Sequence, residues 1–530
     1  MVTFAGGTVA DVYTGTWIAA NVAVEDGRIV YVGPDAFGEV VDVGGKVLVP
    51  GYVEPHAHPW CLYSPASLLE VAVPDGTTTI VYDNLFFFIA HGVAGLRTIV
   101  DAMRAAPAHV RWVARLAPQT AADAFDVETV ATMLDWPEVV ASGEITNWPA
   151  AARGEFAAPI AAAKRARRRV EGHHAGASYG RLNALAAAGI SSDHEAITGE
   201  EARQRLRLGM WTMLRQSSLR PDLEAMLGDL RDIVPSARRL MFTTEGAVPS
   251  FYAERGVISG CLEIATRLGV DPMRALQAAT LDPATFLGLD EELGGIAPGR
   301  RATFNVLGEI GAWRPEQVVV DGAVVACDGA LTVPTPAIAW PRGPGLTAPD
   351  AFTPLTGVQP VARYESAVIN RRVDRDVTAG DLQAALVARD GSWVTQGVIE
   401  NLMDTPGFAT TATTSLHLLV LGTDPEAMAR AARRVVDMGG GFAFDGGWSA
   451  PLEIDGLVAA GGFDRALAIE RELSAAMAAA GYPFHDPLYS LLFASCDFLP
   501  EVRLTPRGLL EVKSRAVLAS PSRIDTVPPC

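Results

Sequence analysis

The chain has 530 residues, of which 49% are hydrophobic and 20% are charged, so we expect a globular protein of two or three domains. Its 43 Lys and Arg and 61 Asp and Glu give a net charge of −18, which excludes nucleic acid and anionic membranes as expected partners. The first residues lack the pattern of a signal peptide, and the most apolar run, Leu85–Ala90, is too short to cross a bilayer.

Short strands and tight turns are predicted for residues 1–49. The pair Asp26-Gly27 lies between two apolar runs, which is typical of a β-hairpin. A second hairpin is predicted around Asp321-Gly322. Because these β-rich pieces flank a long middle segment, we expect residues 1–49 and 297–345 to form one small composite β-sandwich domain.

The middle segment, residues 50–296, alternates strand-like runs with alanine-rich helical patterns, for example at 181–188 and 200–208. Such alternation predicts parallel strands with helices packed against them. Its length suits a single TIM-like (β/α)8 barrel, so an α/β fold is expected here. The strand-like runs are 77–82, 110–116, 139–144, 170–173, 190–194 and 240–244.

A proline- and glycine-rich stretch at 331–362 is typical of a linker. Beyond it, a strand-like run at 415–421 and helical patterns at 425–438 and 465–480 predict another folded unit. We therefore expect an additional C-terminal α/β domain over residues 346–530.

Two histidines, His56 and His58, follow a short β-rich run that contains Pro50-Gly51. Residues i and i+2 of a strand point to the same side, so both imidazoles are expected to converge on one point, as a divalent metal requires. A His-x-His pair alone is a weak indication of a metal site, and it gains weight from the residues at later strand ends.

Polar side chains follow the ends of later strands at intervals that fit a barrel. Glu144 lies 86 residues after His58, His173 a further 29, His194 a further 21 and Glu245 a further 51. These gaps match three, one, one and two strand–helix units, which places the groups at the end of the barrel where such enzymes hold their catalytic residues. Four imidazoles and two carboxylates there predict a hydrolytic site with two divalent ions, for which Mn, Fe and Zn are all suitable.

Neighbouring polar residues are assigned by the direction in which they point. Asp193 and Glu195 flank His194, and we expect them to orient the ligands from behind. His174 points away from His173 on a strand and is not expected to bind metal. The other histidines, which are His91, His109, His417 and His485, are expected to be structural. His91 is close enough to the second strand to reach the pocket.

Motifs run along nearly the whole chain: Pro50–His58, Gly143–Asn147, Glu171–His173, Gly189–Glu195, Gly209–Ser218, Ala279–Ala284, Gly294–Arg300, Gly439–Gly441 and Leu499–Thr505. Through them the chain resembles the amidohydrolase superfamily and, within it, the adenine deaminase family. The His-x-His pair is shared by the whole superfamily, whereas Ser191–Glu195 together with the extra C-terminal domain is fairly specific to the adenine deaminase family.

The resemblance implies a metal-dependent hydrolase that deaminates adenine to hypoxanthine and releases ammonia. It implies metal binding by His56, His58, His173 and His194, with Glu144 between the ions. We expect Glu245 to bind metal as well, and to carry the proton from the attacking water to the ring nitrogen and the departing ammonia. Glu144 and Glu245 are therefore the expected catalytic residues.

The chain departs from the family pattern at four places. The family has Thr-Asp-Asp at the last barrel strand and this chain has Thr244–Gly246, with Glu245 in the middle. The extra methylene moves the proton carrier by about 1.5 Å, a shift that can cost about 100-fold in rate. Trp60 stands where the family has a carboxylate, the family's Asp-Pro-His-Glu is Asp83–Phe86 here, and its His-Asp-Ser-His-Asn is Thr413–His417.

These changes remove polar groups that could recognise a purine. Trp60, Asp83 and Phe86 are the expected substrate-binding residues. The aromatic residues among them, together with Phe87 and Phe88, either make the pocket apolar or pack the barrel.

Three functions are compatible with the sequence: a deaminase of adenine or a related aminopurine, an amidohydrolase for a cyclic amide or a modified aminopurine, and a catalytically dead homologue used for binding. The intact set of metal ligands argues against the third.

The expected partner is a small-molecule substrate, a purine or a cyclic amide, and the expected assembly is a homodimer. The cysteines are scattered with no Cys-x-x-Cys pair, which favours a reducing compartment and hence a cytoplasmic location. They are Cys61, Cys261, Cys327, Cys496 and Cys530.

Overall fold

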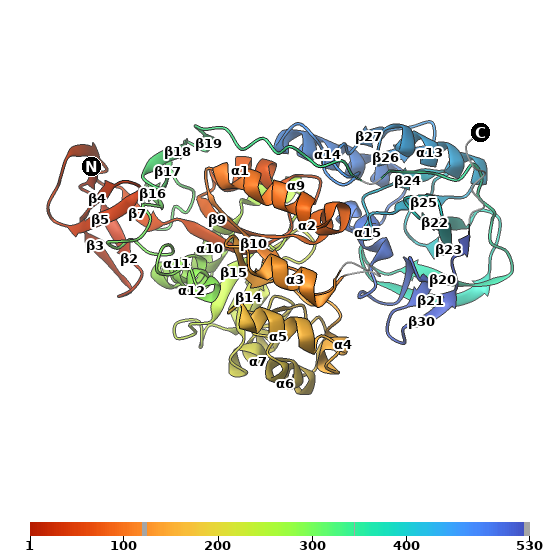
Figure 1. Cartoon of the computed structure of the whole chain (residues 1–530), viewed down its shortest axis with the longest axis horizontal. Coiled ribbons are helices and arrows are strands. Elements are labelled where there is room, and N and C mark those ends of the chain that lie inside the picture. Colours follow the sequence, from red (N-terminus) through yellow and green to blue (C-terminus); the bar gives the residue numbers. More distant parts are fainter. Residues whose placement is uncertain (119–124, 344, 524–530) are drawn as a thin grey trace.

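The computed structural model describes residues 1–118, 125–343 and 345–523. Along its longest axis, N-terminal strands lie at one end, a central unit of strands and helices lies in the middle, and a C-terminal unit lies at the other end (Figure 1). One of the scattered cysteines, Cys530, lies outside the described residues, and the other four are free thiols.

Two sheets form the β-rich end. The first has the order β5 (Arg28–Gly33), β4 (Asn21–Glu25), β1 (Val2–Ala5) and β6 (Glu39–Asp42). The second has the order β19 (Ala330–Leu331), β18 (Ala323–Cys327), β17 (Gln317–Val320), β16 (Phe304–Leu307), β7 (Val47–Pro50), β2 (Thr8–Asp11) and β3 (Thr16–Ala19). Since β7 pairs with both β2 and β16, the N-terminal segment and the segment after the central unit share one sheet.

Both predicted hairpins are confirmed. β4 and β5 are joined at Asp26-Gly27, and β17 and β18 are joined at Asp321-Gly322. The aspartates have φ of 49° and the glycines have φ of 75° and 80°, which is the left-handed geometry that a type I′ turn requires at both positions.

The strands of the central unit are parallel and follow chain order. They are β8 (Tyr52–Ala57), β9 (Thr77–Asp83), β10 (His109–Ala114), β11 (Val139–Ser142), β12 (Glu171–Gly172), β13 (Ser192–Asp193), β14 (Trp211–Arg215) and β15 (Leu240–Thr243). Their ladders form two four-stranded sheets, β8 to β11 and β12 to β15. Isolated bridges join the sheets, from Ala57 to Glu245 at one seam and from Ile145 to Gly172 at the other.

The predicted barrel is therefore confirmed only in part. The described strands keep the order of a (β/α)8 barrel, but their ladders do not close into one. β12 and β13 are only two residues long, and the histidines that follow them lie in the polar cluster at the strand ends rather than in a ladder.

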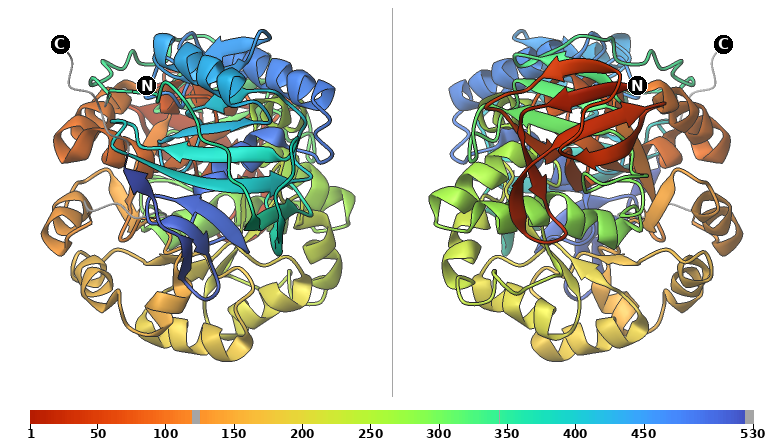
Figure 2. Two further views of the ribbon diagram at one scale, coloured as in Figure 1. Left: turned by 90° about the vertical axis from the view of Figure 1, so that its right-hand side faces the viewer. Right: turned by 90° about the vertical axis from the view of Figure 1, so that its left-hand side faces the viewer.

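Helices cover the outside of these strands (Figure 2). They are α1 (Pro65–Ala72), α2 (Leu85–Ala102), η1 (Met103–Ala105), α3 (Val127–Leu134), α4 (Trp148–Ala152), α5 (Ala157–Arg165), α6 (Tyr179–Ala188), α7 (Gly199–Arg207), α8 (Leu223–Asp229), α9 (Pro249–Arg255), α10 (Ile258–Arg267), α11 (Pro272–Ala279) and α12 (Leu281–Leu287). Several start at a side chain that accepts hydrogen bonds from the first turn, such as Ser64 before α1 and Asp126 before α3. β8 and β9 are buried along their whole length, as expected for parallel strands covered on both faces.

One helical stretch, Leu85–Ala105, is longer than the apolar run noted in the sequence. Among the described residues it is the one with the length and hydropathy needed to cross a membrane. The side chains Leu85–Phe88 are buried in the protein core, and Gly92 interrupts the helical geometry with φ of 64°. The start of the stretch is therefore a core helix that kinks at this glycine.

The C-terminal unit combines a large sheet, a small sheet and helices. The large sheet has the order β21 (Asn370–Asp376), β20 (Val358–Tyr364), β23 (Trp393–Glu400), β22 (Leu382–Val387), β25 (Leu418–Gly422), β24 (Phe408–Thr410), β26 (Gly441–Phe444) and β27 (Ser449–Pro451), with β31 (Ser522–Arg523) beside β23. The small sheet is β28 (Val502–Thr505), β29 (Gly508–Glu511) and β30 (Ala516–Ala519), and the helices are α13 (Pro425–Asp437), α14 (Phe463–Ala479), α15 (Pro487–Leu492) and η2 (Phe493–Ser495). Both predicted helices are confirmed, and one apolar core continues from the central unit into this one.

Candidate active site

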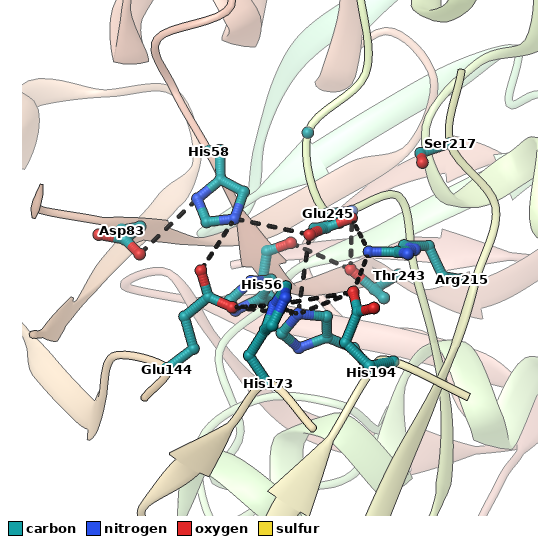
Figure 3. Close-up of polar contacts among 12 residues, drawn as sticks. His56, His58, Asp83, Glu144, His173, His194, Arg215, Ser217, Thr243 and Glu245 are labelled. Carbon is teal, nitrogen blue, oxygen red and sulfur yellow. Dashed lines mark hydrogen bonds and ion pairs between the residues drawn. The ribbon is translucent and has the colours of Figure 1, made fainter. Parts of the chain in front are cut away.

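The six predicted metal ligands meet at the C-terminal ends of the central strands (Figure 3). His56 lies in β8, and the others come within two residues of the ends of β8, β11, β12, β13 and β15. They fall into two groups, within each of which the candidate ligand atoms lie within 4.8 Å of one another. The first is His56, His58 and Glu144, and the second is His173, His194 and Glu245 together with a seventh residue, Glu195. The residues selected by sequence spacing are thus adjacent in the fold.

Glu144 lies between the two groups. Its Oε2 is 2.8 Å from His173 Nδ1 and 3.2 Å from His194 Nε2, and its Oε1 is 3.7 Å from His58 Nε2. Glu245 Oε1 lies 3.9 Å from His58 Nε2 and 3.7 Å from His194 Nε2. Both carboxylates therefore reach histidines of both groups.

The cluster is built to hold positive charge. His173 Nδ1 and His194 Nε2 face each other at 3.2 Å, and the Nε2 atoms of His56 and His173 are buried without a hydrogen-bond partner among the described residues. Burial lowers the pKa of His56 and of His173, but Glu171 beside the first and Glu195 beside the second help to outweigh it, and both pKa values rise to about 9. Carboxylates that stabilise a cation at these rings, with imidazole nitrogens as donors, fit divalent metal ions.

A fully buried arginine, Arg115, holds two of the carboxylates. It directly follows β10 and donates from Nε to Asp83 Oδ2 at 2.5 Å and from Nη2 to Glu144 Oε1 at 2.6 Å. Burial opposes ionisation of Glu144, but Arg115 outweighs it and holds the pKa of Glu144 well below its ordinary value. Asp83 Oδ2 also lies 3.7 Å from His58 Nδ1. Asp83, expected to bind substrate, therefore lies behind His58, because the pairing with Arg115 draws it away from the cavity.

A second arginine, Arg215 at the end of β14, joins two carboxylates of the other group. Its Nη1 donates to Glu195 Oε1 at 2.6 Å and also to Glu245 Oε2. Arg220 Nη1 lies 3.3 Å from Glu195 Oε2. Glu195 was expected to orient ligands from behind, but it faces the cavity and shares a group of candidate ligand atoms with His173.

Asp193 lies behind the cluster, as expected, but it orients a different side chain. It pairs with His174 Nδ1 and accepts a hydrogen bond from Arg205 Nε at 2.9 Å. His174 thus points away from the site, in agreement with the sequence pattern, and Asp193 fixes it rather than His194.

Four residues of the site were not expected from the sequence: Glu54, Arg115, Glu171 and Arg215. The two arginines stand at the ends of β10 and β14, and the rule of strand ends that selected the histidines also applies to them. Glu54 and Glu171 each precede a site histidine by two residues, so strand alternation places them on the same face. Glu171 Oε2 is 3.0 Å from His56 Nδ1, a contact that fixes the ring of this candidate metal ligand.

A cavity of about 480 Å³ opens onto the cluster. Trp60 and Phe86 line it with ring centroids 4.5 Å apart, and Trp60 also lies 4.5 Å from the His58 ring. Phe87 and Phe88 are absent from the described lining and pack against other rings. Both alternatives for the aromatic residues thus hold in part, since Trp60 and Phe86 make the wall apolar and the other two pack the unit.

The far wall of the cavity comes from the C-terminal unit. Phe498 lies edge-on to the His173 ring at 5.4 Å between centroids, and Tyr489 donates a hydrogen bond to the backbone oxygen of Gly246. His485, expected to be structural, also lines this wall because α15 brings its loop to the cavity. The remaining histidines lie away from it, each with a polar partner: His91 with Asp455, His109 with Thr303 and His417 with Arg389.

Two protein-family models match the chain. The amidohydrolase family matches residues 47–325, and the adenine deaminase C-terminal domain matches residues 361–516. A provisionally named adenine deaminase of Halalkalibacterium halodurans is 34% identical over 95% of this chain and 92% of that protein. Adenine deaminases of Moorella thermoacetica and Cenarchaeum symbiosum are 32% and 31% identical, over 96% of this chain and 93% and 91% of theirs.

Solved structures share the fold over a little less than two thirds of the chain. A beta-aspartyl dipeptidase of Fervidobacterium islandicum is 15% identical with a TM-score of 0.50, over 63% of this chain and 98% of that one. An atrazine chlorohydrolase variant of Arthrobacter aurescens, complexed with zinc and atraton, is 16% identical with a TM-score of 0.50, over 63% of this chain and 97% of that one. By its sequence matches, this chain belongs to the amidohydrolase family and, within it, to the adenine deaminases.

Proposed function

We propose that this protein is a metal-dependent aminohydrolase that converts adenine and water to hypoxanthine and ammonia. The observation that carries the proposal is the group of histidines and carboxylates at the strand ends, which opens onto a cavity completed by the C-terminal unit. The relatives named adenine deaminase and the matched C-terminal domain support adenine as the substrate.

Six side chains are proposed to hold two divalent ions, with Mn, Fe and Zn all compatible with imidazole and carboxylate donors. The side chains that would hold them are His56, His58, Glu144, His173, His194 and Glu245. Glu195, which lies in the same group, is a further candidate ligand. When bound, such ions lower the pKa of a coordinated water toward neutrality.

Glu245 is proposed to move the proton. Arg215 holds Glu245 Oε2, so that Oε1 is directed toward His58 and His194. In that position the carboxylate accepts one proton of the attacking water and gives it to the ring nitrogen, and then carries the second proton of that water to the amine, which leaves as ammonia. Arg115 helps to hold the pKa of Glu144 well below its ordinary value, so Glu144 is proposed to stay ionised while Glu245 moves the proton.

The cavity offers a flat apolar wall and a polar one. Trp60 and Phe86 are proposed to contact the face of the purine ring, because aromatic rings gain most from stacked or edge-on contacts. Ser217 and Arg220 also line the cavity and are proposed to bind ring nitrogens at the purine edge. Asp83 keeps a supporting part through His58.

The same proposal covers the organisation of the chain. Residues 1–49 with 297–345 are assigned to a composite β-domain, 50–296 to a (β/α)8 barrel unit and 346–530 to the C-terminal domain. The pairing of β7 with β16 and the separate family matches support this division.

A cytoplasmic homodimer is proposed as the assembly. The free thiols support a reducing compartment, and size-exclusion chromatography with light scattering would measure the number of subunits.

A substrate panel tests the proposal. Metal-loaded protein is offered adenine and, separately, a cyclic amide such as hydantoin. Adenine turnover is followed by ammonia release and by the ultraviolet change to hypoxanthine, and turnover of the cyclic amide by the carboxylic acid that its ring opening releases. We expect kcat/KM for adenine to exceed that for the cyclic amide. Preference for the cyclic amide, with metal bound, would overturn the assignment of the substrate and keep that of the metal site.

A further inference from the structure

The turn that carries Glu245 has a backbone shape that its own residues do not favour. Glu245 has φ of 60°, a left-handed conformation that residues other than glycine seldom adopt. The next residue, Gly246, packs so closely that an added Cβ would lie 2.8 Å from His58 Cβ. His58 N also donates to the backbone oxygen of Glu245 at 2.7 Å. A conformation of this kind persists only when the surrounding structure holds it.

Tyrosine hydroxyls from three elements hold this turn. Tyr63 donates to the backbone oxygen of Ala247 at 2.9 Å, and Tyr252 accepts from the backbone N–H of Ala247 at 3.3 Å. Tyr489 donates to the backbone oxygen of Gly246, the residue next to Glu245. The first two tyrosines belong to the central unit, whereas Tyr489 lies in α15 of the C-terminal unit.

Tyr489 is well placed to connect the two units at the reaction centre. It is 6% exposed, and its ring stacks on Phe493 with centroids 5.4 Å apart. Its hydroxyl also lies 3.3 Å from Cys61 Sγ, next to Trp60 in the loop after β8. One hydroxyl from the C-terminal unit therefore contacts both loops that shape the cavity, the one after β8 and the one after β15.

We propose that Tyr489 is a positioning residue of this enzyme. By fixing the carbonyl of Gly246, its hydroxyl holds the left-handed turn that aims the Glu245 carboxylate at His58 and His194. The inference rests on the proposed function, in which Glu245 moves the proton, and it gives the C-terminal unit a part in the chemical step. Tyr489 acts through the backbone of the turn, so the substrate itself is not its partner.

The test compares Tyr489→Phe with a matched control. Tyr489→Phe keeps the ring and its stacking and removes the hydroxyl. Tyr52→Phe removes another buried hydroxyl, which donates to the backbone oxygen of Trp313 at 2.8 Å. Tyr52 is the first residue of β8, so it lies at the opposite end of that strand from the site. In adenine deamination by metal-loaded protein we expect Tyr489→Phe to lower kcat about tenfold with KM within about twofold, and Tyr52→Phe to keep kcat.

A second measurement does not depend on turnover. Deuterium exchange of the backbone amides over residues 243–250 should be faster in Tyr489→Phe than in wild type, and unchanged in Tyr52→Phe, while thermal melting shows that both variants are folded. Unchanged exchange in Tyr489→Phe would overturn the inference, and so would a raised KM at constant kcat, which would place the hydroxyl on the substrate. If wild type releases no ammonia from adenine, the proposed function fails, and the exchange experiment still decides whether Tyr489 holds the turn.

Discussion

Glu245 is longer by one methylene than the aspartate that the family places at the last strand, and in the structure the longer side chain reaches Arg215. Oε2 reaches Arg215 while Oε1 remains near His58 and His194. An aspartate on the same backbone would withdraw the carboxylate by about 1.5 Å and lose this arrangement. The departure from the family pattern is thus accommodated by the arginine at the end of the preceding strand.

The proton-carrying role of Glu245 predicts a graded loss of activity. Glu245→Gln keeps the size of the side chain but cannot accept a proton, so kcat for ammonia release should fall at least about 100-fold. Glu245→Asp should fall by about tenfold, because the carboxylate is retained but displaced. Glu200→Gln, an exposed change on α7, serves as the control and should match wild type. Turnover of Glu245→Gln at the wild-type rate would exclude the role.

Arg115 predicts a loss of stability together with a loss of metal. Arg115→Met leaves Asp83 and Glu144 buried without their cation, so the free energy of unfolding should fall by about 3 kcal/mol. Metal affinity should fall about 10- to 100-fold, since Glu144 loses the group that orients it. Chemical denaturation and metal analysis measure the two effects. The exposed pair Arg267–Glu224 gives the control, because Arg267→Met should leave the free energy of unfolding nearly unchanged. Equal effects of the two changes would contradict this account.

At the scale of elements, strand positions were predictable where burial and β-propensity agree. The runs at 77–82 and 240–244 match β9 and β15 within one residue. The runs at 170–173 and 190–194 shrink to the two-residue strands β12 and β13, because the polar residues that follow leave the ladder for the cluster. β14 was not among the strand-like runs, although the spacing between His194 and Glu245 left room for one more strand–helix unit.

A partly exposed ion-pair network joins Glu138, the residue before β11, to Arg97 of α2 and Arg104 of η1, and it predicts a pH-dependent stability. Burial opposes ionisation of Glu138, but hydrogen bonds from Arg97 and Arg104 outweigh it and lower the pKa of Glu138 to about 2. Its ordinary value in the unfolded chain is about 4.3. The stabilisation is therefore complete above about pH 4.3 and is lost as the pH falls through about 2.

Glu138→Gln tests that network. The melting temperature of the variant should lie below that of wild type at pH 7, and the difference should shrink as the pH falls from about 4.5 toward 2. The exposed change Glu200→Gln, measured in parallel, should show no such trend. A difference between Glu138→Gln and wild type that stays constant over this range would mean that the charge of Glu138 contributes nothing.

At the scale of the whole molecule, the C-terminal unit completes the site. Tyr489 and Phe498 reach the central unit at Gly246 and His173, and residues so far apart in the sequence carry no local pattern that predicts their contact. For the same reason the inward position of His485 could not be predicted. Asp83 and Glu195 were misplaced on similar grounds, because the arginines that decide their direction belong to other strands.

Metal binding is predicted to stabilise the whole protein. Without bound cations the carboxylates of the two groups repel one another in a buried site, and an ion present at about 1,000 times its dissociation constant contributes about 4 kcal/mol. Chelator treatment should therefore lower the melting temperature in calorimetry, and added Mn²⁺ should restore it. The variant His56→Ala, which lacks one proposed ligand, should show a smaller shift. A melting temperature that does not change on chelator treatment would contradict a metal-binding role for the cluster.

The most direct test of the central claim is the yield of ammonia and hypoxanthine from adenine by manganese-loaded protein, measured beside the same protein after removal of metal. We predict equal amounts of the two products, formed only by the metal-loaded protein. Equal yields with and without metal, or no yield from fully loaded protein, would contradict the assignment of this cluster as the site of metal-dependent adenine deamination.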